Sequence, residues 1–391
     1  MSKAVLGFVG DLLIKREHPD EVFRHVRDLL RVPDVLFGNL EGAYTDTPRS
    51  VPGAFGALIS GPARSLDAYA KAGFDVLSLA NNHILDVGYE ALEETRVRLN
   101  EQGVETCGAG NNLAEAREPA ILNAQDLRIA YLAYASVFPM GYEAGFNTPG
   151  LAPMRAYDFW RSSFPLVHMP GVPPVISTVP DQGDLANLKE DIRRARERAD
   201  LVITSFHWGD HTGPFRLTDH EIRTARYCID EGADMVVGHH HHALRGMEWY
   251  EGKPIFYGLG HFVFDMKLEW SPEELKKVLS QASPSGFLES IRYNVAPREG
   301  WPYLPMHEDT RLTAMAWAQA DRNGISDIGI VPCKLRPDGA VQPLSLRTPE
   351  CDELLAYFEK CHTTQGINGV VSESGAPDMG DFATVRVVPA K

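Results

Sequence analysis

The stretch GADMVVGHHHHALRG, residues 232–246, sets four consecutive histidines directly after a short apolar run. The histidines lie far inside the chain, where an affinity tag would not be placed, so the fold itself has to accommodate them. Residues 235–237 predict a buried strand, and the glycine before them ends a predicted helix over residues 219–231. The stretch therefore indicates a helix, a buried strand, and a group of imidazoles where the strand ends.

The same arrangement recurs along the first two-thirds of the chain. Side chains that bind metals or transfer protons follow five other apolar runs: Asp11 after KAVLGFVG, Asn39 and Glu41 after DVLFG, Asn81, Asn82 and His83 after FDVLSLA, His207 after LVITSF, and His261 after PIFYGLG. In open α/β sheets the carboxyl ends of parallel strands form one rim, where sites assemble. We therefore expect these residues, distant in sequence, to converge on rigid elements.

Apolar runs alternate with helical patterns, which predicts an α/β fold with parallel or mixed sheets covered by helices. Strands are predicted at residues 3–9, 34–38, 74–80, 127–134, 201–206, 235–237 and 254–259. Helices are predicted at residues 19–31, 63–72, 89–102, 185–199 and 219–231. The chain shows no repeat and no linker, so we expect one domain over residues 1–391.

Two segments depart from this alternation. Residues 138–180 are rich in proline, glycine, methionine and aromatic residues, and we interpret them as long loops forming a lid over a site. The motif-bearing core spans residues 3–270, and the pattern weakens beyond it. We interpret residues 276–391 as a C-terminal elaboration of the same domain, with a hairpin at residues 327–339.

Composition limits the function. The net charge of −15 argues against general nucleic-acid binding, although a metal ion and arginines can still attract an anion inside a cleft. The five cysteines have no CxxC spacing, which indicates reduced thiols, a cytoplasmic protein and no structural zinc site. The N-terminal apolar run is too short for a signal peptide, and no later run reaches about 18 apolar residues, so we expect no membrane anchor.

The candidate ligands are two carboxylates, a carboxamide and several imidazoles. Mixed oxygen and nitrogen donors suit divalent manganese, iron or zinc, and we expect one or two such ions. A pair of ions about 3.5–4 Å apart would need a bridging carboxylate.

Six motifs together resemble the CapA (poly-γ-glutamate capsule biosynthesis) family of the calcineurin-like metallophosphoesterase superfamily. They are G-D near the N-terminus, N-L-E, N-N-H-x-x-D, H-W-G, G-H-H-x-H and G-L-G-x-F-V-F-D, in this order over residues 10–265. The resemblance implies a sandwich of two mixed β-sheets flanked by helices. It also implies a role for each matching residue.

By that resemblance, Asp11 and His242 are ligands of a first metal and Glu41 is the bridging carboxylate. Asn82, His207 and His240 are implied ligands of a second metal. His83 takes the place of the histidine that protonates a leaving group, and Asp86 orients it.

The sequence also departs from the family patterns. Leu13 stands where superfamily members usually have the histidine of a D-x-H motif, so the first metal is weakly held or the site is mononuclear. His241 and His261 stand where the CapA family usually has proline and asparagine. CapA-like proteins usually begin with a membrane anchor or signal, and the N-terminal run here predicts none, so the capsule role is not carried over.

The remaining candidates have supporting roles. If the backbone stays extended, His240 and His242 point to one side, while His239 and His241 point away towards support of the ligands or substrate. His239, His261 and Asn39 are candidates for additional metal contacts or for support of the ligands, and structural packing is a further alternative for His261. Asn81 is expected only to bond the backbone. Candidates for binding an anionic substrate are Arg16, His211 and Arg245.

Together these features predict a metal-dependent hydrolase acting on a small anionic substrate. Metal-activated hydroxide would attack phosphorus or carbon, while His83 donates a proton to the leaving group. Phosphoester hydrolysis is what the superfamily implies. The alternatives are hydrolysis of an amide, lactam or γ-glutamyl bond at the same site, and a non-catalytic metal- or ligand-binding protein. Homo-oligomerisation is left open.

Overall fold

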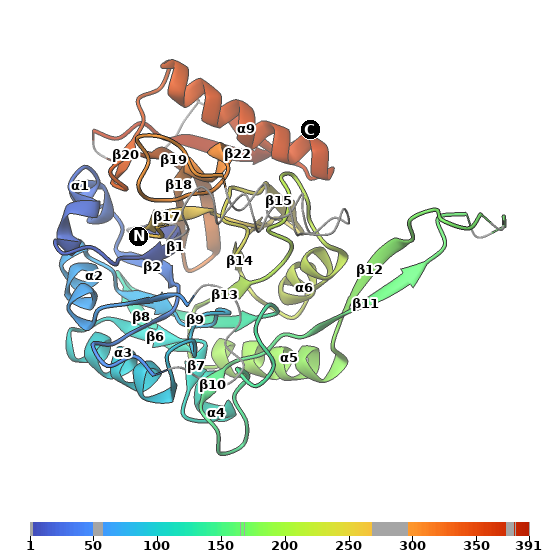
Figure 1. Cartoon of the computed structure of the whole chain (residues 1–391), viewed down its shortest axis with the longest axis horizontal. Helices are drawn as coiled ribbons and strands as arrows, with labels where there is room; N and C mark the ends of the chain where they lie inside the picture. Colours follow the sequence, from blue (N-terminus) through green and yellow to red (C-terminus); the bar gives the residue numbers. More distant parts are fainter. Residues whose placement is uncertain are drawn as a thin grey trace.

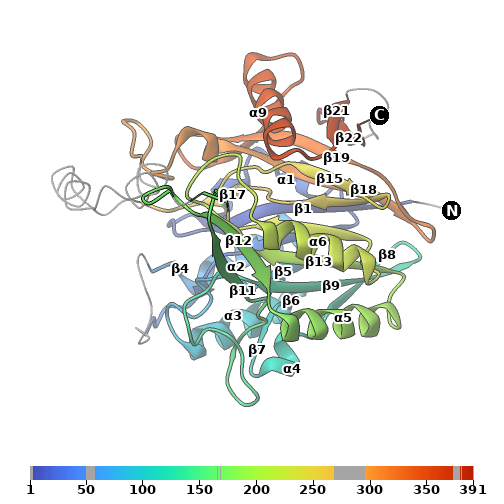
Figure 2. The same cartoon turned by 90° about the vertical axis from the view of Figure 1, so that its right-hand side faces the viewer.

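The computed structural model describes residues 3–49, 58–164, 166–167, 169–267, 296–372, 379 and 381–390. Two large mixed β-sheets form the body of the molecule, and helices cover their outer faces (Figure 1 and Figure 2). The predicted α/β sandwich of two mixed sheets flanked by helices is confirmed.

The first sheet has ten strands. Its order is β21 (Gly369–Ser372), β22 (Val385–Pro389), β19 (Gly324–Leu335), β18 (Leu312–Asp321), β1 (Ala4–Leu13), β2 (Val35–Leu40), β5 (Val76–Ser78) and β6 (Glu105–Cys107), with β17 (His261–Phe264) beside β1 and β20 (Val341–Pro343) beside β19. β1 is buried at every position except Val5, and it pairs in parallel with β2 and β17 and antiparallel with β18. A near-continuous apolar run is what a strand covered on both faces requires.

The second sheet has six strands. Its order is β15 (Met247–Tyr250), β16 (Lys253–Phe256), β14 (Met235–His239), β13 (Leu201–His207), β9 (Leu127–Ala135) and β8 (Ala120–Ala124). β13 lies between β9 and β14 and is parallel to both. Phe37 of β2 stacks on Tyr131 of β9 with ring centroids 5.7 Å apart, so the main core lies between the two sheets.

Helices cover the outer faces. α5 (Gln182–Arg196) and α6 (Asp219–Asp230) pack on the second sheet, where a second apolar core includes Ile192, Val202 and Cys228. α2 (Leu66–Ala72) and α3 (Tyr89–Glu101) lie at the β6 end of the first sheet, and α9 (Pro349–Gln365) covers its C-terminal strands (Figure 2). Among the described helices, none has the length and apolarity needed to cross a bilayer.

The other elements are short. They are β3 (Ala43–Tyr44), β4 (Ser60–Gly61), β7 (Ala109–Gly110), β10 (Gly150–Leu151), α4 (Leu113–Ala116) and 3-10 turns at Ala63–Ser65 and Glu308–Arg311. The helix predicted at residues 19–31 is wrong as a continuous element, because a 3-10 turn (Pro19–Phe23) is followed by a separate one-turn helix, α1 (Arg27–Leu30). Neither His18 nor Val26 provides a side-chain cap, so tertiary packing of the apolar residues holds this segment.

The prediction of structureless loops at residues 138–180 is also wrong in part. β11 (Ala156–Arg161) and β12 (Val175–Pro180) pair as an antiparallel hairpin that projects from the body (Figure 1). The aromatic residues of β11 favour a strand, but its partner lies beyond a proline-rich segment that masks the pattern. We call residues 156–180 the arm.

The C-terminal part contains more regular structure than the sequence indicated. The predicted hairpin at residues 327–339 is confirmed by the pairing of β19 with β20. The longer pairing of β19 is with β18, which itself pairs with β1, so C-terminal strands complete the sheet that the N-terminal strand begins.

Candidate metal centre

Strand register brings the polar residues together at one rim. In the first sheet, Asp11 of β1 lies opposite Asn39 of β2 and opposite His261 of β17. In the second sheet, His207 of β13 lies opposite His239 of β14. Asn39 links the sheets, because its Nδ2 lies 2.8 Å from Asp11 Oδ1 and 3.3 Å from His207 Nδ1. The predicted convergence of side chains from separate strands is therefore observed.

Asp11, His242 and His261 form what we call the aspartate cluster. His261 Nε2 lies 2.6 Å from His242 Nδ1, and His242 Nδ1 lies 3.5 Å from Asp11 Oδ2. One ligand atom from each residue lies within 4.8 Å of the others, and all three side chains are buried. This spacing allows the three atoms to bind one ion.

Asn82, His207 and His240 form a second group, the asparagine cluster. His207 Nε2 lies 2.7 Å from Asn82 Oδ1 and 3.1 Å from His240 Nδ1. The rings of His240 and His242 have centroids 5.8 Å apart, so the two clusters are neighbours. Two adjacent groups of three ligands are what a pair of ions would require.

Several polar atoms at the rim lack the partners that burial demands. Both carboxylate oxygens of Glu41, Asp11 Oδ2, His261 Nδ1 and both ring nitrogens of His239 have no hydrogen-bond partner among the described residues. A buried polar group without a partner costs about 1–3 kcal/mol, and native proteins contain few of them. Their concentration at one place fits the chemistry of a cation site.

The electrostatics of the rim fit the same conclusion. Burial lowers the pKa values of His207, His240 and His242, so these imidazoles are neutral at pH 7, as metal ligands must be. Burial, together with the charges of Asp11 and Asp86, raises the pKa of Glu41 well above its ordinary value. A divalent cation beside Glu41 would stabilise the carboxylate form, which burial disfavours.

His83 and Asp86 form a hydrogen-bonded pair beside the rim. His83 Nδ1 lies 2.7 Å from Asp86 Oδ2, while His83 Nε2 lies 3.9 Å from Glu41 Oε1. Asp86 also accepts hydrogen bonds from the Ile59 amide at 2.9 Å and from the Tyr142 hydroxyl at 3.0 Å. Tyr142 was missed at the sequence level, because a tyrosine in a glycine-rich loop carries no signal of a contact 56 residues away.

The four histidines divide differently from the prediction. β14 ends at His239, and His240 and His242 have φ values of +90° and +58°, so the expected extended backbone is wrong. The two rings nonetheless both face the rim, because the left-handed turns reorient them. His239 was expected to point away, but its Nδ1 lies 3.6 Å from Asp11 Oδ1.

His241 does point away from the rim, as predicted. Its Nε2 lies 2.7 Å from Glu221 Oε1. Glu221 also accepts a hydrogen bond from the backbone N–H of Thr218 at 2.6 Å, which closes the capping box of α6. His241 therefore ties the loop after β14 to the start of a helix.

The three predicted substrate contacts have different surroundings. His211 lies at the rim, with its ring centroid 4.8 Å from that of His240. Arg16 forms a two-pronged ion pair with Asp265 and stacks on Tyr303. Arg245 is fully buried and donates to the carbonyl oxygens of Asp210 and Gly213. Only His211 of the three lies among the rim imidazoles, while both guanidinium groups already have internal partners.

Glycine allows the two halves of the rim to approach closely. A Cβ atom on Gly10 would lie 1.9 Å from the carbonyl oxygen of Gly260. The Asp11 amide donates to that same oxygen at 2.8 Å. The side-chain-free position therefore lets β1 approach the turn that carries His261.

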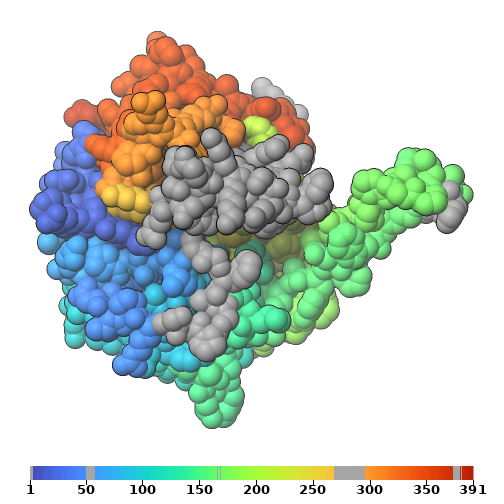
Figure 3. Space-filling view, viewed as in Figure 1, coloured from blue at the N-terminus to red at the C-terminus, as the bar shows by residue number. Residues whose placement is uncertain are grey.

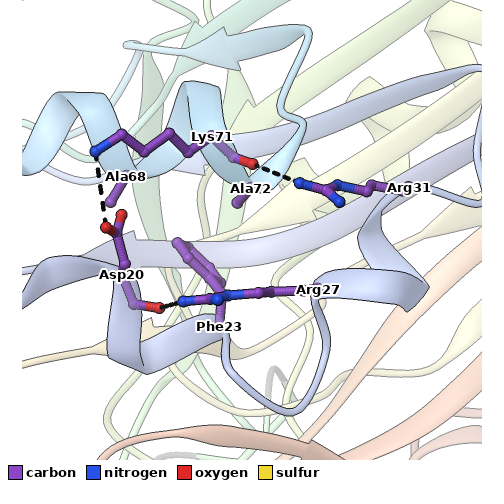
Figure 4. A pocket seen from close by; sticks show the side chains of 7 residues that line it. All are labelled: Asp20, Phe23, Arg27, Arg31, Ala68, Lys71 and Ala72. Carbon is purple, nitrogen blue, oxygen red and sulfur yellow. Dashed lines mark hydrogen bonds and ion pairs between the residues drawn. The ribbon is translucent and has the colours of Figure 1, made fainter.

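A separate pocket of about 150 Å³ lies away from the rim. Its lining residues come from three places, which are the 3-10 turn that follows β1, the region of α1, and α2. They are Asp20, Phe23, Arg27, Arg31, Ala68, Lys71 and Ala72 (Figure 4). Arg27 and Arg31 each donate to a backbone carbonyl, at 3.2 and 3.4 Å. None of the rim residues lines this pocket, so it is not the candidate centre.

A sandwich of two mixed sheets gathers buried Asp, Glu, Asn and His side chains at one rim, which defines an α/β fold with a candidate metal centre. The model of the family described as bacterial capsule synthesis protein PGA_cap matches residues 5–266. The chain belongs to this family, and its predicted membership of the CapA family is confirmed.

Curated relatives cover a similar part of the chain. The PGA biosynthesis protein CapA of Bacillus subtilis is 29% identical over 270 residues, which are 66% of this chain and 63% of that protein. The capsule biosynthesis protein CapA of Bacillus anthracis is 29% identical over 277 residues, 67% of this chain and 60% of that protein. The chain thus matches less than two-thirds of the length of these relatives.

A search of solved structures matched a hypothetical protein from Thermus thermophilus, with a TM-score of 0.46, 14% identity and coverage of 87% of this chain and 100% of that one. The calcineurin-like phosphoesterase YfkN from Bacillus subtilis has a TM-score of 0.35 and 10% identity, covering 93% of this chain and 99% of that one.

Proposed function

We propose that the chain is a metal-dependent hydrolase whose centre holds two divalent ions of manganese, iron or zinc. Asp11, His242 and His261 would hold one ion in the aspartate cluster. Asn82, His207 and His240 would hold the other in the asparagine cluster. The observation that carries the proposal is the group of buried carboxylate and imidazole atoms without hydrogen-bond partners among the described residues, located where these clusters meet.

Glu41 is the proposed bridging ligand. It is fully buried, and neither of its oxygens has a hydrogen-bond partner among the described residues. His261 would act in the aspartate cluster where the superfamily pattern would place a histidine at Leu13. When bound, such ions lower the pKa of water and stabilise negative charge that develops during hydrolysis.

The residues of the chain itself supply the proton transfer. Asp86 accepts the Nδ1 proton of His83, which directs Nε2 towards the side of the rim where Glu41 lies. When both ring nitrogens carry a proton, the imidazolium of His83 would keep its Nδ1–H on Asp86 and give its Nε2 proton to a leaving group, which leaves the neutral ring. A protein that only stores metal has no use for this pair, which favours catalysis over a purely binding role.

The proposed substrate is a small anionic molecule, and phosphoester hydrolysis is the first candidate reaction. The second candidate is hydrolysis of a γ-glutamyl or other amide bond, favoured by the name of a curated relative that refers to PGA biosynthesis. We propose the cytoplasm as the location, because all five cysteines are buried thiols.

The test uses the purified chain loaded with Mn²⁺, Fe²⁺ or Zn²⁺. We expect hydrolysis of p-nitrophenyl phosphate or bis-p-nitrophenyl phosphate, and no release from γ-glutamyl p-nitroanilide. Turnover of the amide alone would replace the first candidate reaction with the second. His83→Ala should lower turnover roughly 10²–10⁴-fold with unchanged metal content, since general acid catalysis contributes about that factor.

His18→Ala is the matched control for that variant, because His18 is exposed and lies outside the rim. It should keep both turnover and metal content. A metal-loaded wild-type chain that hydrolyses neither class of substrate would instead favour the binding protein.

A further inference from the structure

The arm is the most exposed apolar part of the described chain. It projects away from the body, with β11 and β12 side by side (Figure 1 and Figure 3). Its exposed large apolar side chains are Tyr157, Phe159, Trp160, Phe164, Leu166, Val167, Met169, Val175 and Ile176. Trp160 is 66% exposed and Leu166 is 96% exposed. An isolated two-stranded hairpin is only marginally stable in water, so this surface indicates a partner.

The charge of the arm differs from that of the rest of the chain. Residues 156–180 contain one aspartate, one arginine and one histidine, whereas the whole chain carries a net charge of −15. Two copies of so acidic a protein repel one another wherever their bodies approach. A nearly neutral arm that extends from the body is the part through which two copies meet with least repulsion.

The two edges of the arm are not equivalent. β12 ends at Pro180, follows Pro173 and Pro174, and is tied to the body where the Thr178 hydroxyl accepts the His220 amide hydrogen at 2.8 Å. Proline limits strand pairing because it lacks an N–H donor. β11 contains no proline, and among the described strands only β12 pairs with it. The outer edge of β11 is thus the edge suited to accept another strand.

We infer that two copies of this chain associate through the outer edges of their β11 strands, making a four-stranded antiparallel sheet. The two-fold axis that relates the two copies would pass through the middle of β11. The two middle residues are Asp158 and Phe159, so the axis lies at one of them. Centring on Asp158 would place two carboxylates opposite one another. Centring on Phe159 places Tyr157 opposite the second copy's Arg161, a favourable aromatic–cation pair.

The exposed apolar area of one arm is similar in size to the area that a standard interface buries on each partner. Aromatic side chains carry ~150–250 Å² each, so the partly exposed residues of one arm offer on the order of 1,000 Å². A standard interface buries about 800 Å² on each partner. A lipid bilayer is a poorer occupant, because the arm lacks a cluster of Lys or Arg and its unpaired strand edge would leave backbone groups unsatisfied in hydrocarbon.

Sedimentation velocity on the full chain over a range of micromolar concentrations tests the inference. We expect a monomer–dimer equilibrium that Phe159→Lys weakens at least ~30-fold, because it removes a central apolar contact and sets two like charges opposite one another. Met140→Lys, at a 95% exposed position outside the arm, is the matched control and should leave the equilibrium unchanged.

Cross-linking tests the register. In Phe159→Cys, the two introduced thiols face one another across the proposed axis, and the five native cysteines are buried. Mild oxidation should produce covalent dimers about tenfold faster or more than in Met140→Cys, since association gives a high effective thiol concentration. The inference is overturned by a wild-type monomer at all concentrations, by a dimer that Phe159→Lys leaves intact, by equal cross-linking of both cysteine variants, or by binding of the monomer to phosphatidylcholine or phosphatidylglycerol vesicles through the arm.

Discussion

The rim of the metal centre and the arm depart from ordinary protein architecture in opposite senses. The rim buries polar atoms that have no hydrogen-bond partner among the described residues, as at Glu41 and His239. The arm exposes large apolar side chains, as at Trp160 and Leu166. Both arrangements are unfavourable unless something else binds. We propose that cations bind at the rim and that a second copy of the chain binds at the arm.

The two regions also differ in how the fold holds them. Rim residues are attached to strands that pair in register within two sheets, and Asn39 joins those sheets. The arm is one hairpin, bonded at its base through Ser177 and Thr178 of β12. Substitutions at the rim should therefore change metal binding, stability and catalysis together, whereas substitutions in the arm should change association alone.

The largest effect is expected for Asp11→Asn, which keeps the shape of the side chain and removes its charge. We expect loss of at least one bound ion per chain and turnover lower by roughly a thousandfold, because metal ions supply several kcal/mol of transition-state stabilisation. Elemental analysis and steady-state hydrolysis measure the two effects. The exposed Asp126→Asn is the control. Normal metal content in Asp11→Asn would contradict the proposal that the buried polar atoms of the rim bind cations.

Metal removal should produce the next largest effect. Chelation is expected to lower the free energy of unfolding by ~3–4 kcal/mol, the stabilisation that a ligand provides at 100 to 1,000 times its dissociation constant. The proposed ions would offset the repulsion between the buried Asp11 and Glu41 carboxylates. Urea unfolding with and without added Mn²⁺ measures the change. Identical curves would show that the rim is stable without a cation.

Acid should destabilise the metal-free rim. Burial lowers the pKa of His239 from 6.5 to about 4. Because the folded pKa lies below the unfolded value, the unfolded chain binds the extra proton between these pH values, so stability is fully present above pH 6.5 and falls as the pH falls towards 4. The loss from this group is up to ~3 kcal/mol.

Unfolding of the metal-free chain at pH 7 and near pH 4.5 checks this prediction. His239→Gln should flatten the pH dependence, and His18→Gln should leave it unchanged. If the free energy of unfolding of His239→Gln depended on pH as in the wild-type chain, the acid sensitivity would belong to other groups.

The smallest effect on folding is expected in the arm. Trp160→Ser should change the free energy of unfolding by no more than ~0.5 kcal/mol, as expected for an exposed position. Metal content and turnover per chain should stay at wild-type values. Loss of bound metal in this variant would contradict the separation between the two regions.

The sequence predicted best those features that depend on local pattern. Apolar runs located the central strands β1, β2, β13 and β14, since buried strands need continuous apolar residues. The prediction of one helix at residues 19–31 was wrong, because an apolar spacing does not distinguish a helix from two short turns packed on a core. β11 and α9 were missed for a related reason, as their stability comes from partners remote in sequence.

The types of side chain at the rim were determined by the sequence alone, because each follows a strand whose position the apolar pattern reveals. Which of them face one another was decided by the tertiary structure. The positive φ values of His240 and His242, and the pairing of Arg16 with Asp265, have no periodic signature. Contacts between segments 249 residues apart, as in that ion pair, depend on the pairing of β1 with β17, and local preference carries no information about which remote strands pair.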